Sequence, residues 1–389
     1  MTTLRGITWD HARGYEPVRA ASEEFRRLRP DIRIDWEKRS LKDFGDFPVD
    51  VLAREYDLLM IDHPHVGISS AQGALVPLDL HLPADYLADQ AAHAIGPSHR
   101  SYQWNGHQWA LAVDAAAQVA AYRPDLIGAE KPPRSWAEVE ALARSLPPGR
   151  KIGWPLCPTD AMCSFLTLCA GAGGEAFFSE TAGIPDRVGE AALERMLGLL
   201  PLLHESSLLS NPIRMYDRMA KEDDIVYVPL AFGYSNYARS GFSEKLLRFA
   251  NIPGEDGSPR GALLGGVGVA VSASSRSILP AVEFARFLAS GELQRTLYAR
   301  HEGQPGHGSA WRDAEVNRYT HGFFADTRDT LASSYLRPRH AAFPAFQERA
   351  GVLLHEALVH HIHGKEADKS RLIEDMNRLY ETVRKETLV

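Results

Sequence analysis

The sequence contains few cysteines and no long apolar run. Its 389 residues include three cysteines, Cys157, Cys163 and Cys169. An odd number cannot form a closed disulfide framework, and five residues between neighbours do not match the short pairs of usual zinc sites. We therefore expect three free thiols in the core, a state that fits a reducing compartment better than an oxidising one. No apolar stretch approaches the ~18 residues that a membrane-spanning helix needs.

An excess of basic charge and a recognisable leader are also lacking. Lys and Arg total 43 against 50 Asp and Glu, which gives a net charge of −7. Nucleic-acid binding normally requires a basic surface, so no nucleic-acid partner is expected. The opening residues, MTTLRGITWD, lack the apolar run of a secretory signal. We expect a cytoplasmic location, or a periplasmic one if a leader had been removed from the chain.

Familiar catalytic, nucleotide-binding and metal-binding motifs are missing as well. The glycine-rich stretches at 171–174 and 265–268 complete neither a phosphate loop nor a dinucleotide-binding pattern. In HEALVHH, at 355–361, the second histidine comes one residue too late to share a metal with the first on one helix face. No Gly-x-Ser-x-Gly motif is present. We expect the chain not to be an enzyme and to bind no cofactor and no metal.

The composition is that of an ordinary globular protein, with 44% hydrophobic and 24% charged residues. The length favours two domains over one. Residues 4–9 and 32–36 are expected to form strands around a helix at 16–28, a βαβ unit that implies a parallel sheet. The apolar run at 56–61 indicates a strand buried on both faces. Further strands are expected at 109–113, 224–229 and 261–272, and further helices at 137–146, 191–203, 280–288, 292–300 and over most of 343–388.

Several segments resemble one family of binding proteins. An apolar run at 109–113 leads into Asp114, and Tyr-Arg-Pro-Asp-Leu follows at 122–126. Pro-Pro-Arg-Ser-Trp at 132–136 opens a helix, and AVEFARFLASGELQ occupies 281–294. These segments resemble the extracellular solute-binding protein family 1, the maltose-binding-like substrate-binding proteins of ABC transporters. The resemblance covers nearly the whole chain.

The resemblance implies an α/β, two-lobed periplasmic-binding-protein-like fold of type II, each lobe a sheet flanked by helices. It implies an N-terminal lobe of residues 1–112 plus 263–308 and a C-terminal lobe of 113–262 plus 309–389. The lobes would be joined by crossing strands near Val113 and near 261–265. The implied function is non-enzymatic binding of a carbohydrate-like small solute in the interlobe cleft, with hinge closure. The implied partners are ABC-transporter permease subunits, with no insertion of this chain into the membrane.

The candidate ligand-binding residues follow predicted strands, where the loops of open α/β sheets usually meet ligands. They come after the first and third strands, at the crossing strand, and after two strands of the second lobe; the resemblance adds one glycine and one histidine. The candidates are Trp9, Asp10, His11, Arg13, Asp62, His63, His65, Asp114, Trp154, Phe232, Tyr234, Gly265 and His307. Each also has a structural interpretation, such as a helix cap for Asp10 and core packing for the aromatic residues.

Two ligand classes remain open. The aromatic side chains, together with Asp10, Asp62 and Asp114, suit a sugar, because aromatic rings stack on sugar rings and carboxylates accept hydrogen bonds from hydroxyl groups. Arg13 and the histidines could instead hold a carboxylate or a phosphate. The alternative function is therefore a cytoplasmic metabolite-binding or sensor protein for an anionic metabolite, not coupled to transport.

Overall fold

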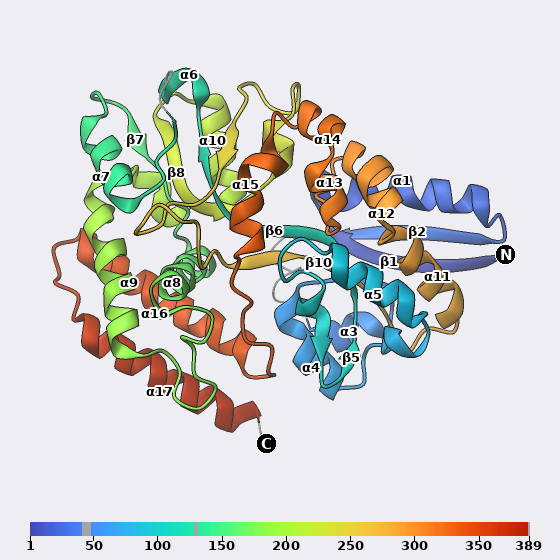
Figure 1. The fold of residues 1–389 in the computed structure, drawn as a ribbon. Helices are drawn as coiled ribbons and strands as arrows, with labels where there is room; N and C mark the ends of the chain where they lie inside the picture. Colours follow the sequence, from blue (N-terminus) through green and yellow to red (C-terminus); the bar gives the residue numbers. More distant parts are fainter. Residues whose placement is uncertain (41–47, 128–130, 388–389) are drawn as a thin grey trace. The chain divides into compact units, whose positions relative to one another are not determined.

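The computed structural model describes residues 1–40, 48–127 and 131–387, and the chain divides into two compact units (Figure 1). Unit 1 comprises residues 1–116, 265–320 and 339–341, and unit 2 comprises 117–264, 321–338 and 342–389. The predicted second lobe contains every residue from 309 onward, whereas 309–320 and 339–341 lie in unit 1. Residues 309–320 stay there because Trp311 is fully buried and its indole N–H donates to the carbonyl of Pro305 at 2.8 Å.

Unit 1 is built around parallel strands, which confirms the predicted βαβ unit. β1 (Thr2–Trp9) pairs in parallel with β2 (Ile32–Arg39) over its whole length, and α1 (Ala12–Leu28) connects them. β3 (Leu58–Ile61) joins the other side of β1, also in parallel. The antiparallel strand β10 (Leu264–Val271) then pairs with β3. The order β2-β1-β3-β10 places the carboxyl ends of the three parallel strands at one edge.

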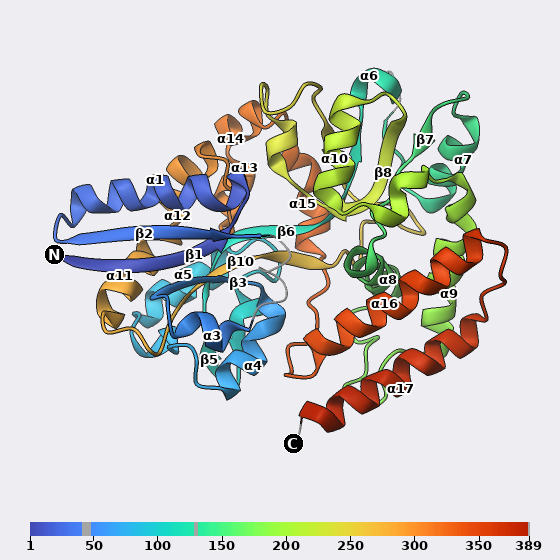
Figure 2. The same ribbon diagram turned by 180° about the vertical axis from the view of Figure 1, so that it is seen from behind.

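Helices cover the sheet of unit 1. In both views α1 lies along β1 and β2 (Figure 2), and it buries Val18, Ala21 and Phe25, the stripe that predicted the helix. The Phe25 ring meets that of Phe284 edge-on at 5.3 Å, within the core on that side of the sheet. The other elements of unit 1 are α3 (Val49–Ala53), α4 (Val66–Ala71), α5 (Ala84–His93), the hairpin β4 (Gln103–Trp104) and β5 (His107–Gln108), α11 (Ile278–Leu288), α12 (Gly291–Leu293), α13 (Gly308–Arg312) and α14 (Ala314–Tyr319).

One strand, β6 (Leu111–Tyr122), runs from unit 1 into unit 2. All of its residues except Tyr122 are buried, and half of them are alanines. The expectation that this strand ends at Asp114 was wrong, because Asp114 lies inside it. A buried aspartate can continue a strand when its charge is neutralised, and Arg13 provides that neutralisation here.

Unit 2 also combines strands with helices. β8 (Ile225–Phe232), predicted at 224–229, pairs in parallel with β7 (Lys151–Ile152) and antiparallel with β6. β9 (Arg248–Ala250) pairs with β6 as well. The helices of unit 2 are α6 (Pro124–Ile127), α7 (Trp136–Ser145), α8 (Pro158–Gly173), α9 (Asp186–Leu199), α10 (Pro212–Lys221), α15 (Phe323–Ala332), α16 (Phe343–Ile362) and α17 (Lys369–Thr387). The predicted helices at 137–146, 191–203 and 343–388 are thereby confirmed, with boundaries that shift by a few residues.

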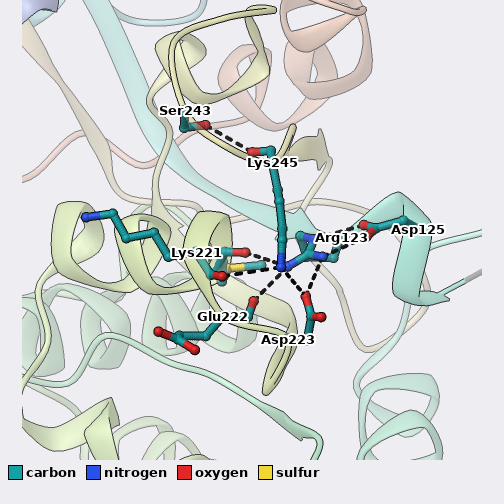
Figure 3. Close-up of polar contacts among 8 residues, drawn as sticks. Arg123, Asp125, Lys221, Glu222, Asp223, Ser243 and Lys245 are labelled. Carbon is teal, nitrogen blue, oxygen red and sulfur yellow. Dashed lines mark hydrogen bonds and ion pairs between the residues drawn. The ribbon is translucent and has the colours of Figure 1, made fainter.

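The Tyr-Arg-Pro-Asp-Leu motif at 122–126 has a structural role. The side chain of Arg123 is 1% exposed and donates five hydrogen bonds of 2.6–2.8 Å (Figure 3). The acceptors are the carboxylates of Asp125 and Asp223 and the carbonyl groups of Met219 and Glu222. All five guanidinium donors are thus satisfied, and they hold the end of β6 against the last turn of α10. This motif, which contributed to the family resemblance, positions the chain and leaves no donor of Arg123 for a ligand.

Two expectations from the sequence concern the cysteines and membrane-spanning helices. Cys157, Cys163 and Cys169 are free, the first half-buried and the other two buried. Across the described ranges, no helix combines the length and the apolar character that crossing a membrane requires.

A buried carboxyl group at the start of α8 leads to a prediction about pH. Burial raises the pKa of Asp160 to about 7, and the Cys157 thiol donates to its Oδ2 at 3.1 Å. An unfolded aspartate titrates near ~3.9, so between about pH 4 and 7 the native state holds a proton that the unfolded state has lost. The contribution of Asp160 to stability is therefore complete below about pH 4 and is lost as the pH rises through about 7.

We expect Asp160→Asn to remove this pH dependence. At about 1.4 kcal/mol per unit of pKa, the free energy of unfolding of the wild type should fall by up to ~4 kcal/mol, relative to that of the variant, between pH 4.5 and 7.5. Urea denaturation of both proteins at four pH values measures the difference, which cancels the contributions of all other carboxyl groups. Parallel stability curves for the two proteins would contradict the prediction.

Candidate functional site

The carboxyl ends of β1, β2 and β3 bring one set of the candidate residues together in unit 1. Trp9 lies opposite Arg39 in the β1–β2 pairing, and Ile7 lies opposite Leu59 in the β1–β3 pairing. Because these strands are parallel and adjacent, the residues that follow Trp9 and Ile61 are neighbours at one edge of the sheet. We call the residues 9–13, 38–39 and 62–65 the strand-end cluster.

Trp9 is part of the core, and Asp10 is part of a surface ion pair. Trp9 is 3% exposed, and a Cβ atom on Gly14 would lie 2.4 Å from its ring, so the indole packs directly on the first turn of α1. The structural interpretation of Asp10 as a helix cap was wrong, because His11 is the N-cap of α1. Asp10 is exposed and pairs with Lys38, whose Nζ is 2.7 Å from its Oδ1.

His11 is a neutral acceptor at the helix N-terminus. Its Nδ1 accepts a hydrogen bond from the backbone N–H of Arg13 at 3.0 Å. Burial, with a further contribution from the Arg13 charge, lowers the pKa of His11 to about 4. At neutral pH this histidine therefore carries no positive charge with which to attract an anion.

Arg13 and Asp114 form a buried, bidentate ion pair. Arg13 Nε donates to Asp114 Oδ2 at 2.8 Å and Arg13 Nη2 donates to Oδ1 at 2.5 Å, and the two side chains are 5% and 0% exposed. Burial raises the pKa of Asp114, and the guanidinium opposes that effect. The two-point geometry keeps both groups charged and engaged with each other. It ties the first turn of α1 to the middle of β6.

The loop after β3 begins with an aspartate cap. Asp62 Oδ1 accepts from the backbone N–H of His63 at 2.8 Å and lies 3.1 Å from His63 Nδ1. His63 is fully buried, with its ring edge-on to that of Tyr102. Asp62 and His65 are half-buried, so they are the residues of this loop that a ligand can reach.

The three aromatic candidates of unit 2 differ in exposure. Trp154 is fully buried, stacks on Trp136 at 5.8 Å and donates from Nε1 to Ser164 Oγ at 2.9 Å. Tyr234 is also buried, while Phe232 is half-buried. Trp154 therefore serves the core of unit 2, and Phe232 at the end of β8 presents the accessible aromatic surface.

The remaining two candidates lie on the return strand and on a loop of unit 1. Gly265 is half-exposed at the start of β10. His307 is the N-cap of α13, and its ring stacks on that of His93 with centroids 5.2 Å apart. The loop before it pairs with β6, since Gly306 N donates to Val113 O at 3.2 Å. His307 is thus held beside α5 by its own loop, where its ring stacks on His93 and its Nδ1 lies 2.7 Å from Ser309 Oγ.

Sequence reasoning missed several polar residues at strand ends. Lys38 and Arg39 belong to the strand-end cluster because β2 continues to Arg39, beyond the predicted end at residue 36. In unit 2, Ser235 and Asn236 form a buried 3₁₀ turn, Ser235–Ala238, directly after β8. The alternation of apolar and charged residues stops at Trp36, and residues 37–39 are all charged, so the pattern placed the end of the strand too early. The turn after β8 carried no periodic signal at all.

The accessible part of the strand-end cluster is suited to hydrogen bonding. Asp10 and Asp62 offer carboxylate acceptors, and Lys38 offers an ammonium donor beside Asp10. Acceptors and donors of both charges next to one another can bind a ligand rich in hydroxyl groups, each of which donates and accepts.

Comparison with known proteins agrees with this architecture. No family model matches the sequence. Among solved structures, maltose-bound MalE3 of T. maritima matches with a TM-score of 0.84 and 19% identity, over 98% of this chain and 100% of that one. A solute-binding protein of an ABC transporter from Thermotoga lettingae TMO, bound with α-D-tagatose, matches with a TM-score of 0.81 and 15% identity, over 98% and 100% of the two chains. Another, from Agrobacterium radiobacter K84 in complex with ribitol, gives 0.80 and 17%, over 98% of each chain. The chain therefore has the α/β fold of the solute-binding proteins of ABC transporters.

Proposed function

We propose that this protein is a non-enzymatic solute-binding protein for a neutral, hydroxyl-rich ligand such as a sugar or a polyol. The observation that carries the proposal is the match of fold over 98% of the chain to proteins solved with maltose, tagatose and ribitol. A fold hosts more than one function, so the ligand class rests on the residues of the site as well.

The residues of the strand-end cluster support a neutral ligand over an anion. An anionic ligand would depend on the positive charge of Arg13. That side chain donates hydrogen bonds to both carboxylate oxygens of Asp114. His11 is neutral at physiological pH because burial lowers its pKa to about 4. The accessible charged residues of the cluster, Asp10, Lys38, Arg39 and Asp62, are of mixed sign and suit hydroxyl groups.

We propose a binding mechanism that uses both units. β6 and β10 each contain residues of both units, so they are the segments about which the units could change their arrangement. A ligand that binds residues of both units stabilises only an arrangement of the units that permits both sets of contacts. Binding then shifts the population toward that arrangement.

A ligand screen followed by mutation tests the function. Thermal-shift measurements across neutral sugars, polyols, sugar phosphates and organic acids should identify a stabilising ligand, because a compound at about 100 times its Kd adds about 2.7 kcal/mol to the stability of the native state. We expect the neutral hydroxyl-rich compounds to stabilise. Stabilisation by phosphorylated or acidic compounds alone would favour the anionic alternative, and no stabilisation by any compound would contradict both.

Calorimetry with the ligand so found tests the residues. Asp62→Ala should weaken binding about tenfold or more, since hydrogen bonds to a charged group contribute about 1.5–3 kcal/mol. The matched control is Asp31→Ala, an exposed aspartate directly before β2, at the opposite end of the strands. The affinity of this control variant should equal that of the wild type.

Small-angle scattering with and without the ligand tests the proposed mechanism. An unchanged radius of gyration would contradict a change in the arrangement of the two units on binding.

A further inference from the structure

Three potential metal ligands converge in unit 1, away from the strand-end cluster. Asp89 and His93 lie one turn apart on α5, and His307 caps α13. Each residue offers one atom that can bind a metal, and these three atoms all lie within 4.8 Å of one another. Asp89 and His93 are exposed while His307 is buried, so the group forms a site that is open on one side.

Backbone contacts fix the two segments that carry these residues. Ile95 N donates to Gly306 O at 3.2 Å, and Ala94 and His307 form an isolated antiparallel bridge. A Cβ atom at Gly308 would lie 2.9 Å from the carbonyl oxygen of His93, so this close approach requires glycine. The end of α5 and the loop before α13 are therefore held together before any ligand binds, which lowers the entropic cost of assembling a site.

The Nδ1 atoms of both histidines are oriented by neighbouring oxygens. His93 Nδ1 lies 2.9 Å from Asp89 Oδ1, and His307 Nδ1 lies 2.7 Å from Ser309 Oγ. The described residues make no hydrogen bond to either Nε2 atom, and the rings are nearly parallel, at 17°. In metal sites the second nitrogen of a histidine is usually held by an oxygen, as Ser309 Oγ holds Nδ1 of His307, which leaves Nε2 of that ring for a metal. His93 faces Asp89 through Nδ1 itself, so an ion bound to these two residues would take the place of their contact.

The packing around His307 also fixes the position of its ring. A Cβ atom at Gly291 would lie 2.7 Å from the His307 ring, so the ring fills the space against α12 and has little freedom to turn away.

We propose that Asp89, His93 and His307 form a binding site for a divalent transition-metal ion, with Zn²⁺ as the test ion. Two imidazoles and one carboxylate suit Zn²⁺ and its neighbours among the first-row metals better than Mg²⁺ or Ca²⁺. Three protein ligands leave a coordination position for water. A bound ion would join α5 to the loop that pairs with β6, and so would stabilise unit 1.

Titration of the metal-free full-length protein with Zn²⁺ tests this proposal. We expect saturable binding and a rise in Tm for the wild type. His93→Ala and Asp89→Asn replace exposed side chains and should each weaken binding about tenfold or more. The double variant His360→Ala/His361→Ala removes histidines at the end of α16, a separate place where Zn²⁺ could bind, and should leave both the affinity and the rise in Tm unchanged.

The outcomes separate the metal site from a purely structural group. If the wild type and His93→Ala bind Zn²⁺ with equal affinity, or if millimolar Zn²⁺ leaves the Tm of the wild type unchanged, the three residues form an ion pair and a helix cap only, and the proposal is overturned. The replacement of Zn²⁺ by Co²⁺ gives a visible absorption spectrum that depends on the coordination geometry and the ligands of the bound ion. That spectrum should be lost in His93→Ala while circular dichroism shows that the variant is folded.

Discussion

Replacing Asp114 with alanine should lower the free energy of unfolding of unit 1 by about 3–5 kcal/mol, because it removes the carboxylate that pairs with the buried guanidinium of Arg13. Both carboxylate oxygens of Asp114 receive hydrogen bonds from Arg13, so the substitution removes two charge-assisted hydrogen bonds at once. Urea denaturation followed by tryptophan fluorescence measures the loss.

Two further variants make this result interpretable. Asp10→Ala breaks the exposed pair with Lys38 and should cost about 1 kcal/mol or less, because solvent screens such pairs. The double variant Arg13→Met/Asp114→Leu removes both buried charges and should recover most of the stability. If Asp114→Ala costs no more than Asp10→Ala, the pair does not have the energetic role that its burial implies.

Gly266→Ala should be the second strongly destabilising change, at about 2–5 kcal/mol. Gly266 has φ +107°, and a Cβ atom there would lie 2.4 Å from the backbone oxygen of Asp114 and 2.8 Å from the Cα atom of Ala115. Backbone strain of about 1–3 kcal/mol adds to the cost of overpacking, which is of similar size. Neither contacting atom can move without displacing β6.

Gly106→Ala separates the two contributions. Gly106 has φ +82°, and a Cβ atom there would meet nothing within 4 Å. Its replacement should therefore cost only the backbone strain, about 1–2 kcal/mol. The difference between the two variants in urea denaturation measures the steric part. Equal losses would show that β10 and β6 can separate enough to admit a methyl group.

Periodicity and apolar runs were sufficient to predict the regular elements of this chain. The alternation at 32–36 and the apolar run at 56–61 lie within or across β2 and β3, and the stripe of Val18, Ala21 and Phe25 lies on the buried face of α1. The return of residues 263–308 to the first lobe was inferred only from the family resemblance, since no local pattern carries it. Residues 339–341 were missed because a three-residue contact leaves no pattern at all.

The candidate site was predicted at the level of strand ends, and less well at the level of individual side chains. An aspartate in an apolar strand gives the same signal whether it binds a ligand or, as with Asp114, an arginine 101 residues away. An aromatic residue after a strand likewise gives one signal, whether it is buried like Trp154 or accessible like Phe232. Burial is decided by segments distant in the sequence, so these residues could not be sorted before the fold was known. The role of the strand-end cluster in binding, the location of the protein in the cell and a permease partner stay predictions.

The interleaving of the two units also determines when each can form during synthesis. The chain passes from one unit to the other five times, and unit 1 takes its last residues from 339–341. There the backbone oxygen of Arg339 lies so close to Gly67 that a Cβ atom on Gly67 would be 1.8 Å from it. A ribosome must therefore release nearly the whole chain before either unit has all of its parts, and early segments such as β1 to β3 must wait with apolar surface exposed. This protein should depend on chaperones more than its size alone suggests.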